Sequence, residues 1–179
     1  MGIPLYGQNK GGDTLDRQRG LVYHDVAATT HNNTVTAADI TSFDIPAGVL
    51  QVGSLIKVRS CIKVIDNNST DTLTAICTLG SVSGVTSGAI DVDDNDIIYF
   101  DMQFVVTKLG TAGTAVSMGY VGTDATGSTL LHADQVDMTS VPFNDANGPI
   151  AVKVAVNVDW SVAHAHNQAT HQWTTIELS

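Results

Sequence analysis

Apolar and polar residues alternate strictly along two long stretches of the chain. Between residues 54 and 66, Ile56, Val58, Ser60, Ile62 and Val64 fall on one face, and Lys57, Arg59, Cys61 and Lys63 fall on the other. A second alternation places Ile150, Val152, Val154, Val156 and Val158 on a single face. Period two is typical of a half-buried β-strand. Such strands must cover their apolar faces with a second sheet, so the pattern predicts an antiparallel β-sandwich.

Weaker patterns predict the rest of the sandwich. We expect strands at 21–26, 72–79, 97–108 with a bulge near 101–104, 114–121 and 172–178, besides the two alternating stretches. The turn at Pro46-Ala47-Gly48 should join 38–45 to the following strand as a hairpin, and the turn at 67–69 should continue a meander. Loops are expected at 31–33, 80–88, 124–128, 144–149 and 161–170, and 130–139 is weakly patterned. The eight or nine strands, without an amphipathic helix, predict an all-β, jelly-roll-like fold.

Composition supports this fold and narrows the class of partner. The 179 residues fit one domain, and good helix formers are sparse: Glu177 is the only Glu. A net charge of −10 repels a phosphate backbone, so we expect no nucleic-acid partner. No apolar run is long enough for a membrane helix, and the opening residues lack the pattern of a secretory leader, so we expect no membrane partner.

The first twenty residues differ from the remainder and predict an extended N-terminal arm (1–20) before the sandwich domain (21–179). Gly is frequent in this segment and periodicity is absent. Its composition fits either a frayed terminus or an arm that docks on a partner. In the second case the contacts would come from an apolar tip and three of the eight basic residues: Ile3, Pro4, Leu5, Tyr6, Lys10, Arg17 and Arg19.

Motifs for catalysis are missing from the sequence, since it holds no nucleophile elbow, P-loop or dinucleotide fingerprint. Alternate oxygen ligands in the run from Asp91 to Asp96 imitate the start of a calcium loop, but Asp96 stands where Gly is required, which favours a solvated loop. His164, His166 and His171 could share Zn²⁺, although a loop is the favoured interpretation. We therefore expect no enzyme, no cofactor and no metal.

Cys61 and Cys77 are the only cysteines, and each falls within an expected strand. Two cysteines do not form a disulfide framework, so we expect reduced thiols, with one bridge between neighbouring strands as the alternative.

Several segments together resemble virion proteins of tailed bacteriophages. They are the opening GIPLYGQNK, the segment TSFDIPAGVLQVGSLIKVRSCIKVI, the strand AVKVAVNVDW and the terminal TTIEL. The resemblance spans residues 2–178 and implies a jelly-roll-like body behind a short leading arm. It also implies a structural role, commonly as a homotrimer. The His-rich loop departs from the Ser- and Ala-rich loop that the resemblance implies.

Two roles follow from this resemblance. The first is a capsid decoration (cement) protein, made in the host cytoplasm, which binds the major capsid protein on the outer surface of the virion as a homotrimer and stabilises the shell. The alternative is a head-fibre or tail-fibre module that binds host-surface glycans. Trp160 and Trp173 are the candidate stacking platforms for a sugar, although burial at strand ends is the favoured interpretation of both.

Overall fold

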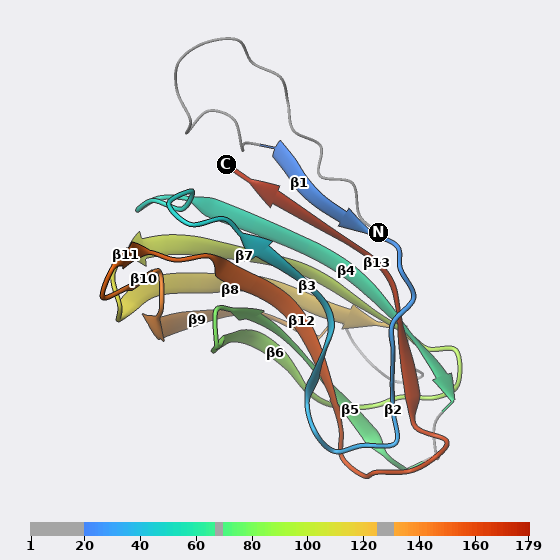
Figure 1. Cartoon of the computed structure of the whole chain (residues 1–179). Helices are drawn as coiled ribbons and strands as arrows, with labels where there is room; N and C mark the ends of the chain where they lie inside the picture. The colour runs from blue at the N-terminus through green and yellow to red at the C-terminus, as the bar shows by residue number, and fades with distance from the viewer. Residues whose placement is uncertain (1–19, 67–69, 125–130) are drawn as a thin grey trace.

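The chain folds into two antiparallel sheets packed face to face, in a computed structural model that describes residues 20–66, 70–124 and 131–179 (Figure 1). The large sheet has the order β1 (Gly20–Asp25), β13 (Gln168–Leu178), β4 (Leu55–Asp66), β7 (Ile97–Lys108), β8 (Gly113–Thr123) and β9 (Leu131–Val141), and β2 (Thr30–Asn32) also pairs with β13. The small sheet has the order β3 (Ala38–Ile45), β12 (Val152–Trp160), β5 (Thr72–Leu79) and β6 (Val82–Asp91). A short hairpin joins β10 (Asn144–Asp145) to β11 (Gly148–Pro149). The predicted all-β sandwich is confirmed.

Helices are absent from the described residues, and the described part of the chain accordingly has no helix that could cross a membrane.

The core lies between the inner faces of the two sheets. In the small sheet Val154 stands opposite Leu79, and Trp160 stands opposite Leu73. In the large sheet Ile56 pairs with Phe104. All of these side chains are buried, and they belong to one continuous apolar cluster. Burial of large apolar side chains of this kind stabilises a fold by about 1.5–3 kcal/mol each.

The strands with the clearest alternation have the faces that the sequence predicts. In β4 the side chains of the apolar face are buried, and the charged residues of the other face are exposed or half-buried. In β5 and β12 the predicted apolar faces are also buried. The expected first strand, the strand at 114–121 and the turn at 144–149 are likewise present as β1, β8 and the β10–β11 hairpin.

The predicted hairpin and meander are wrong. β3 and β4 lie in different sheets, because β3 pairs with β12 whereas β4 pairs with β7 and β13. β4 and β5 are likewise in different sheets. The turn predicted at 67–69 lies outside the described residues. Alternation fixes which face of a strand is buried but not which strand becomes its neighbour, so sequential strands were wrongly paired.

Five smaller predictions are corrected. The expected loop at 80–88 is mostly strand β6, and the weakly patterned 130–139 is mostly strand β9. The bulge expected near 101–104 is absent, since β7 alternates without interruption from Ile98 to Val106. The last strand begins at Gln168, earlier than expected. His31, expected in a polar loop, is buried in β2.

Gly84 allows β6 to approach the large sheet closely. A Cβ atom at this position would lie 2.5 Å from Ser117 Oγ and 2.8 Å from a ring carbon of Phe104. Ser117 Oγ also accepts a hydrogen bond from the Val85 amide at 3.2 Å. The run of small residues that made this segment resemble a loop is therefore what permits the two sheets to meet along β6.

Asp25 links the two sheets at the opposite edge of the sandwich. Its carboxylate accepts hydrogen bonds from Tyr23 Oη at 2.9 Å, from the Ala27 amide at 2.8 Å and from Thr41 Oγ1 at 3.0 Å. Thr41 belongs to β3, so the last of these bonds crosses between sheets. Burial acts to raise the pKa of Asp25, but the three hydrogen bonds outweigh it and hold this pKa below its ordinary value.

We predict that Gly84→Ala destabilises the fold by about 1–3 kcal/mol, because the added methyl group overpacks the contact between the sheets. Urea unfolding at neutral pH measures this change. Ser83→Ala, at an exposed position on the same strand, is the matched control and should change the free energy of unfolding by less than about 0.5 kcal/mol. Unchanged stability of Gly84→Ala would contradict the close approach of the sheets.

We predict that Asp25→Asn lowers the free energy of unfolding by about 1 kcal/mol at neutral pH. A depressed native-state pKa contributes stability that is complete above the unfolded-state pKa and is lost as the pH falls through the native-state pKa. The difference between wild type and variant should therefore shrink below the ordinary value of 3.8. Urea titrations at neutral and strongly acidic pH test this expectation, and an equal difference at both would contradict it.

Candidate functional site

Three aromatic rings lie side by side on the outer face of the large sheet, and we call them the aromatic row: Trp173 of β13, Tyr99 of β7 and Tyr120 of β8. The ring centroids of Tyr99 and Trp173 are 5.8 Å apart, and those of Tyr99 and Tyr120 are 6.1 Å apart. Register explains this arrangement, because Trp173 and Tyr99 are both cross-strand neighbours of Cys61 on β4. All three side chains are half-buried, so part of each ring faces solvent.

A hollow of about 390 Å³ lies beside the row, lined by Ile97, Tyr99, Tyr120, Gly122, Thr123 and Asp124. Gly122 stands directly opposite Tyr99 and has no side chain to fill the space. Asp124 is held at the rim because its Oδ1 accepts a hydrogen bond from the Ile97 amide at 2.5 Å. The hollow therefore joins two aromatic rings to a carboxylate on an open surface.

Charged side chains surround the row on its other side. Arg59 Nε lies 3.4 Å from Asp101 Oδ2, and Arg59 Nη1 lies 3.8 Å from Glu177 Oε1. Asp101 is the cross-strand neighbour of both Arg59 and Tyr120. Burial raises the pKa of Tyr99, and the nearby Asp101 charge adds to this effect. The Tyr99 hydroxyl is therefore protonated at neutral pH.

The two tryptophans lie in different environments. Trp160 is 1% exposed and lies in the core, which confirms the interpretation of burial for this residue. Trp173 instead belongs to the aromatic row, so burial is wrong for this one. A signal for Trp160 was present, since it continues the even-numbered buried face of β12. For Trp173 the register shift between His171 and Trp173 breaks the alternation, and only strand pairing places it beside Tyr99.

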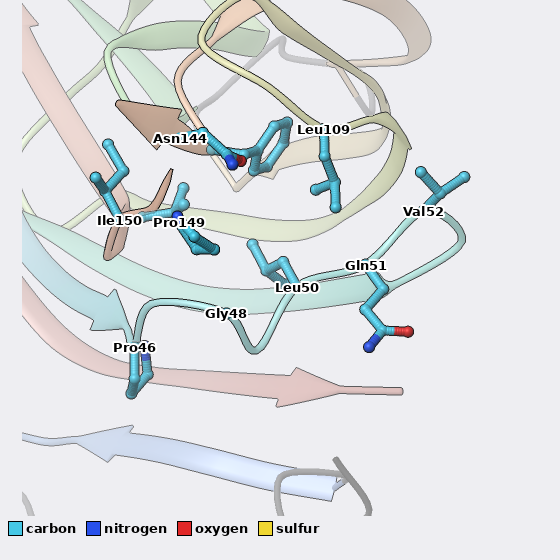
Figure 2. A pocket seen from close by; sticks show the side chains of 11 residues that line it. Pro46, Gly48, Leu50, Gln51, Val52, Leu109, Asn144, Pro149 and Ile150 are labelled. Atoms are coloured by element: carbon cyan, nitrogen blue, oxygen red, sulfur yellow. The ribbon is translucent and has the colours of Figure 1, made fainter. Parts of the chain in front are cut away.

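An apolar pocket of about 440 Å³ opens at one end of the sandwich (Figure 2), and we call it the end pocket. Loops 46–54, 109–112 and 142–151 surround it, and its walls include Pro46, Leu50, Val52, Leu109, Phe143 and Ile150. Leu50 and Phe143 are buried, whereas Val52 is 64% exposed. The pocket was not predicted from the sequence, because the three loops come together only through the sheet topology.

The chain enters the sandwich at the same end as this pocket. Gly20 at the start of β1 pairs with Leu178, and Ser179 exchanges two backbone hydrogen bonds with Leu55, at 2.8 and 3.0 Å. Leu55 directly follows the loop that carries Leu50 and Val52. The predicted arm contacts Ile3, Pro4, Leu5, Tyr6, Lys10, Arg17 and Arg19 lie outside the described residues.

The three candidate zinc ligands are divided between two environments. The rings of His164 and His166 stack in the loop after β12, with centroids 5.3 Å apart. His171 is buried in β13, where Nδ1 donates to the Ala27 carbonyl at 2.7 Å and Nε2 lies 2.8 Å from Thr174 Oγ1. Because a carbonyl only accepts, the proton of His171 is on Nδ1. This histidine supports the fold and is unavailable to a shared ion.

The acidic run after β6 folds into a tight turn. Asp96 Oδ2 accepts a hydrogen bond from the Asp93 amide at 2.6 Å, and the Asp96 amide donates to the Asp93 carbonyl at 3.1 Å. Burial raises the pKa of Asp96, and repulsion from Asp124, Asp93 and Asp94 adds to it. Over residues 20–66, 70–124 and 131–179, no three His, Cys, Asp or Glu side chains are grouped to hold a metal ion.

The two cysteines are free thiols in different sheets, so the alternative of a disulfide is wrong. Cys77 is buried in the core, and this burial raises its pKa to about 12. Cys61 is half-buried beside the aromatic row, and burial raises its pKa as well. Neither thiol is therefore activated as a nucleophile.

Comparison with known proteins finds no matching family model and no matching curated protein. Three solved structures share low similarity with the chain. A legume lectin-like domain from Entamoeba histolytica is 10% identical, with 85% of this chain and 82% of that chain covered and a TM-score of 0.30. The CBM2 module of the Lactobacillus casei BL23 phage J-1 evolved Dit is 11% identical, with 88% and 75% covered and a TM-score of 0.31.

The third structure, of infectious bursal disease virus Gx strain, is 15% identical, with 99% of this chain and 46% of that chain covered and a TM-score of 0.32. All three TM-scores are low, and these likenesses carry no argument about what this chain does.

We predict that the two tryptophans respond differently to truncation. Trp160→Ala should lower the free energy of unfolding by about 3–5 kcal/mol, because it leaves a cavity in the core. Trp173→Ala should cost about 1 kcal/mol, since it removes one aromatic contact on a solvated face. Urea unfolding of both variants measures the difference, and comparable losses would contradict the placement of Trp173 on the outer face.

Proposed function

We propose that this chain is a non-enzymatic structural protein of a tailed-bacteriophage virion, a capsid decoration protein that binds the outer capsid surface as a homotrimer and stabilises the shell. The sequence resemblance to such virion proteins and the sandwich fold support this role. The observation that carries the proposal is that Gly20, where the described part of the chain begins, lies at the end of the sandwich where the end pocket opens. In this proposal the apolar arm and this apolar pocket both contribute to capsid binding.

The composition of this end fits attachment to another protein. In this proposal Ile3, Leu5 and Tyr6 of the arm supply apolar contacts to the capsid, and three basic residues supply polar ones: Lys10, Arg17 and Arg19. Val52 adds a large, exposed apolar side chain at the pocket mouth. An exposed apolar side chain at the mouth of an apolar pocket is a feature of interaction sites.

A trimer with three such ends would stabilise a shell through multivalency. Each further contact between the trimer and the capsid is intramolecular once the first has formed, so overall binding exceeds the affinity of a single arm. Binding only to the assembled shell stabilises that state by mass action. Loss of a capsomer would then require several contacts to break together.

The second candidate function is a head-fibre or tail-fibre module that binds host-surface glycans. The aromatic row favours it, because flat rings beside carboxylates on an open face are suited to sugar recognition. The copy number relative to the major capsid protein in purified virions, measured by quantitative mass spectrometry, distinguishes the two roles. Near-stoichiometric abundance supports decoration, whereas a few tens of copies or fewer supports a fibre or tail component.

We predict that deletion of residues 1–12 abolishes binding to capsids that lack the protein, while the body keeps its melting temperature. Val52→Lys should weaken the same binding at least tenfold, because it places a charge at the mouth of the end pocket. Val26→Lys is the matched control: Val26 is 65% exposed, close to Val52 at 64%, but it follows the other end of β1. Co-sedimentation with capsids measures binding. Full coating by the truncated protein would overturn the docking role of the arm.

A further inference from the structure

We propose that the aromatic row and the adjacent hollow form a binding site for a neutral oligosaccharide on the outer face of the large sheet. The inference deepens the second candidate function and does not depend on the decoration role, since a decoration protein can also carry a sugar site. Failure of the sugar-binding test would therefore leave the decoration role standing, and failure of the capsid-binding test would leave the sugar site standing.

The rings supply the apolar half of such a site. Trp173, Tyr99 and Tyr120 come from three different strands, yet they form a continuous row because their centroids are 5.8 and 6.1 Å apart. A pyranose ring presents a face of C–H groups that packs against an aromatic ring, with hydroxyl groups around its edge. Rigid aromatic side chains provide large contact area at low cost in conformational entropy.

Polar side chains on both sides of the rings supply hydrogen-bond partners for the hydroxyl groups of a bound sugar. Asp124 is fixed at the rim of the hollow by its bond to the Ile97 amide, so its orientation is set before a ligand arrives. On the other side, Arg59 and Asp101 form an ion pair beside Tyr120. Groups held in place in this way recognise hydroxyl groups without a further ordering penalty.

The hollow provides room for a sugar ring. Its volume of about 390 Å³ lies within the range of small-molecule sites, about 300–1,000 Å³. Gly122, opposite Tyr99 in the neighbouring strand, lines the hollow and has no side chain to fill it. The site is open to solvent along the sheet, which suits a chain of several sugar rings better than a single enclosed molecule.

The negative charge around the aromatic row favours neutral sugars over anionic ones. The chain has a net charge of −10, and Asp101, Asp124 and Glu177 surround the row, with Arg59 already paired to two of these carboxylates. A polyanionic glycan would be repelled by this field, whereas a neutral one would not. The ligand class is therefore a neutral oligosaccharide that exposes flat C–H faces.

The two tryptophans make binding directly measurable in the full chain. In Trp160→Phe the tryptophan fluorescence, excited selectively over that of the tyrosines, comes from Trp173 alone. Titration with cellohexaose, chitohexaose, maltohexaose and xylohexaose should change the intensity or the emission maximum with at least one sugar, in a saturable manner. We expect a dissociation constant in the micromolar to millimolar range, as is typical of open, shallow sites. No saturable change with any of the four sugars would overturn the proposal.

Matched variants, followed by calorimetric titration, test the role of the flat ring. Trp173→Phe keeps an aromatic face and should weaken binding less than tenfold, whereas Trp173→Leu keeps apolar bulk without a flat face and should weaken it more than tenfold. Met118→Ala, at a position 38% exposed on the same face but outside the row, should leave binding unchanged. Equal binding by all three variants would show that the row only stabilises the sheet, and would overturn the proposal.

Discussion

The packing of two apolar inner faces against each other is the interaction on which this structure depends. Each strand has one apolar face because its side chains alternate, and that face is stable only when the opposite sheet covers it. The two sheets approach each other most closely where β6 of the four-stranded sheet meets β8 and β9 of the seven-stranded sheet. Gly84 and the Ser117 hydroxyl make that approach sterically possible.

The same packing explains why aromatic residues on the outer face of the large sheet point to a binding role. Inner-face residues are constrained by volume, so their aromatic side chains, such as Phe100 and Phe104, are accounted for by the core. Outer-face residues are free of that constraint. Three aromatic rings gathered there at a register set by β4 are therefore not required by the packing of the sandwich, although cross-strand contacts between them add some stability.

The sequence predicted burial well and strand partners poorly, for a physical reason. Alternation in β4, β5 and β12 is a local property, and each buried face follows directly from it. Pairing is decided by contacts distant in the chain, such as Val154 opposite both Phe43 and Leu79, which no local pattern records. Strand β6 was predicted as a loop because its residues are small, and the structure shows that small residues are needed there for the two sheets to approach closely.

The candidate sites were harder to predict for the same reason. Tyr99, Tyr120 and Trp173 lie on three strands, and the end pocket is built from three loops, so neither site exists as a motif in the sequence. Trp160 continues a visible alternation and could have been assigned to the core. Trp173 follows a register shift, and its exposure could not be derived without the neighbouring strands.

The two candidate sites lie toward opposite ends of β7. Its C-terminal end reaches the loop that contributes Leu109 to the end pocket, while Tyr99 lies near its N-terminal end. Thr107 follows Tyr99 by eight positions, which corresponds to roughly 26 Å of extended strand. If the end pocket were fixed to a support, the strands would act as a rigid spacer that holds the aromatic row away from that support. Shortening the strands would reduce the distance between the row and the support without altering either site.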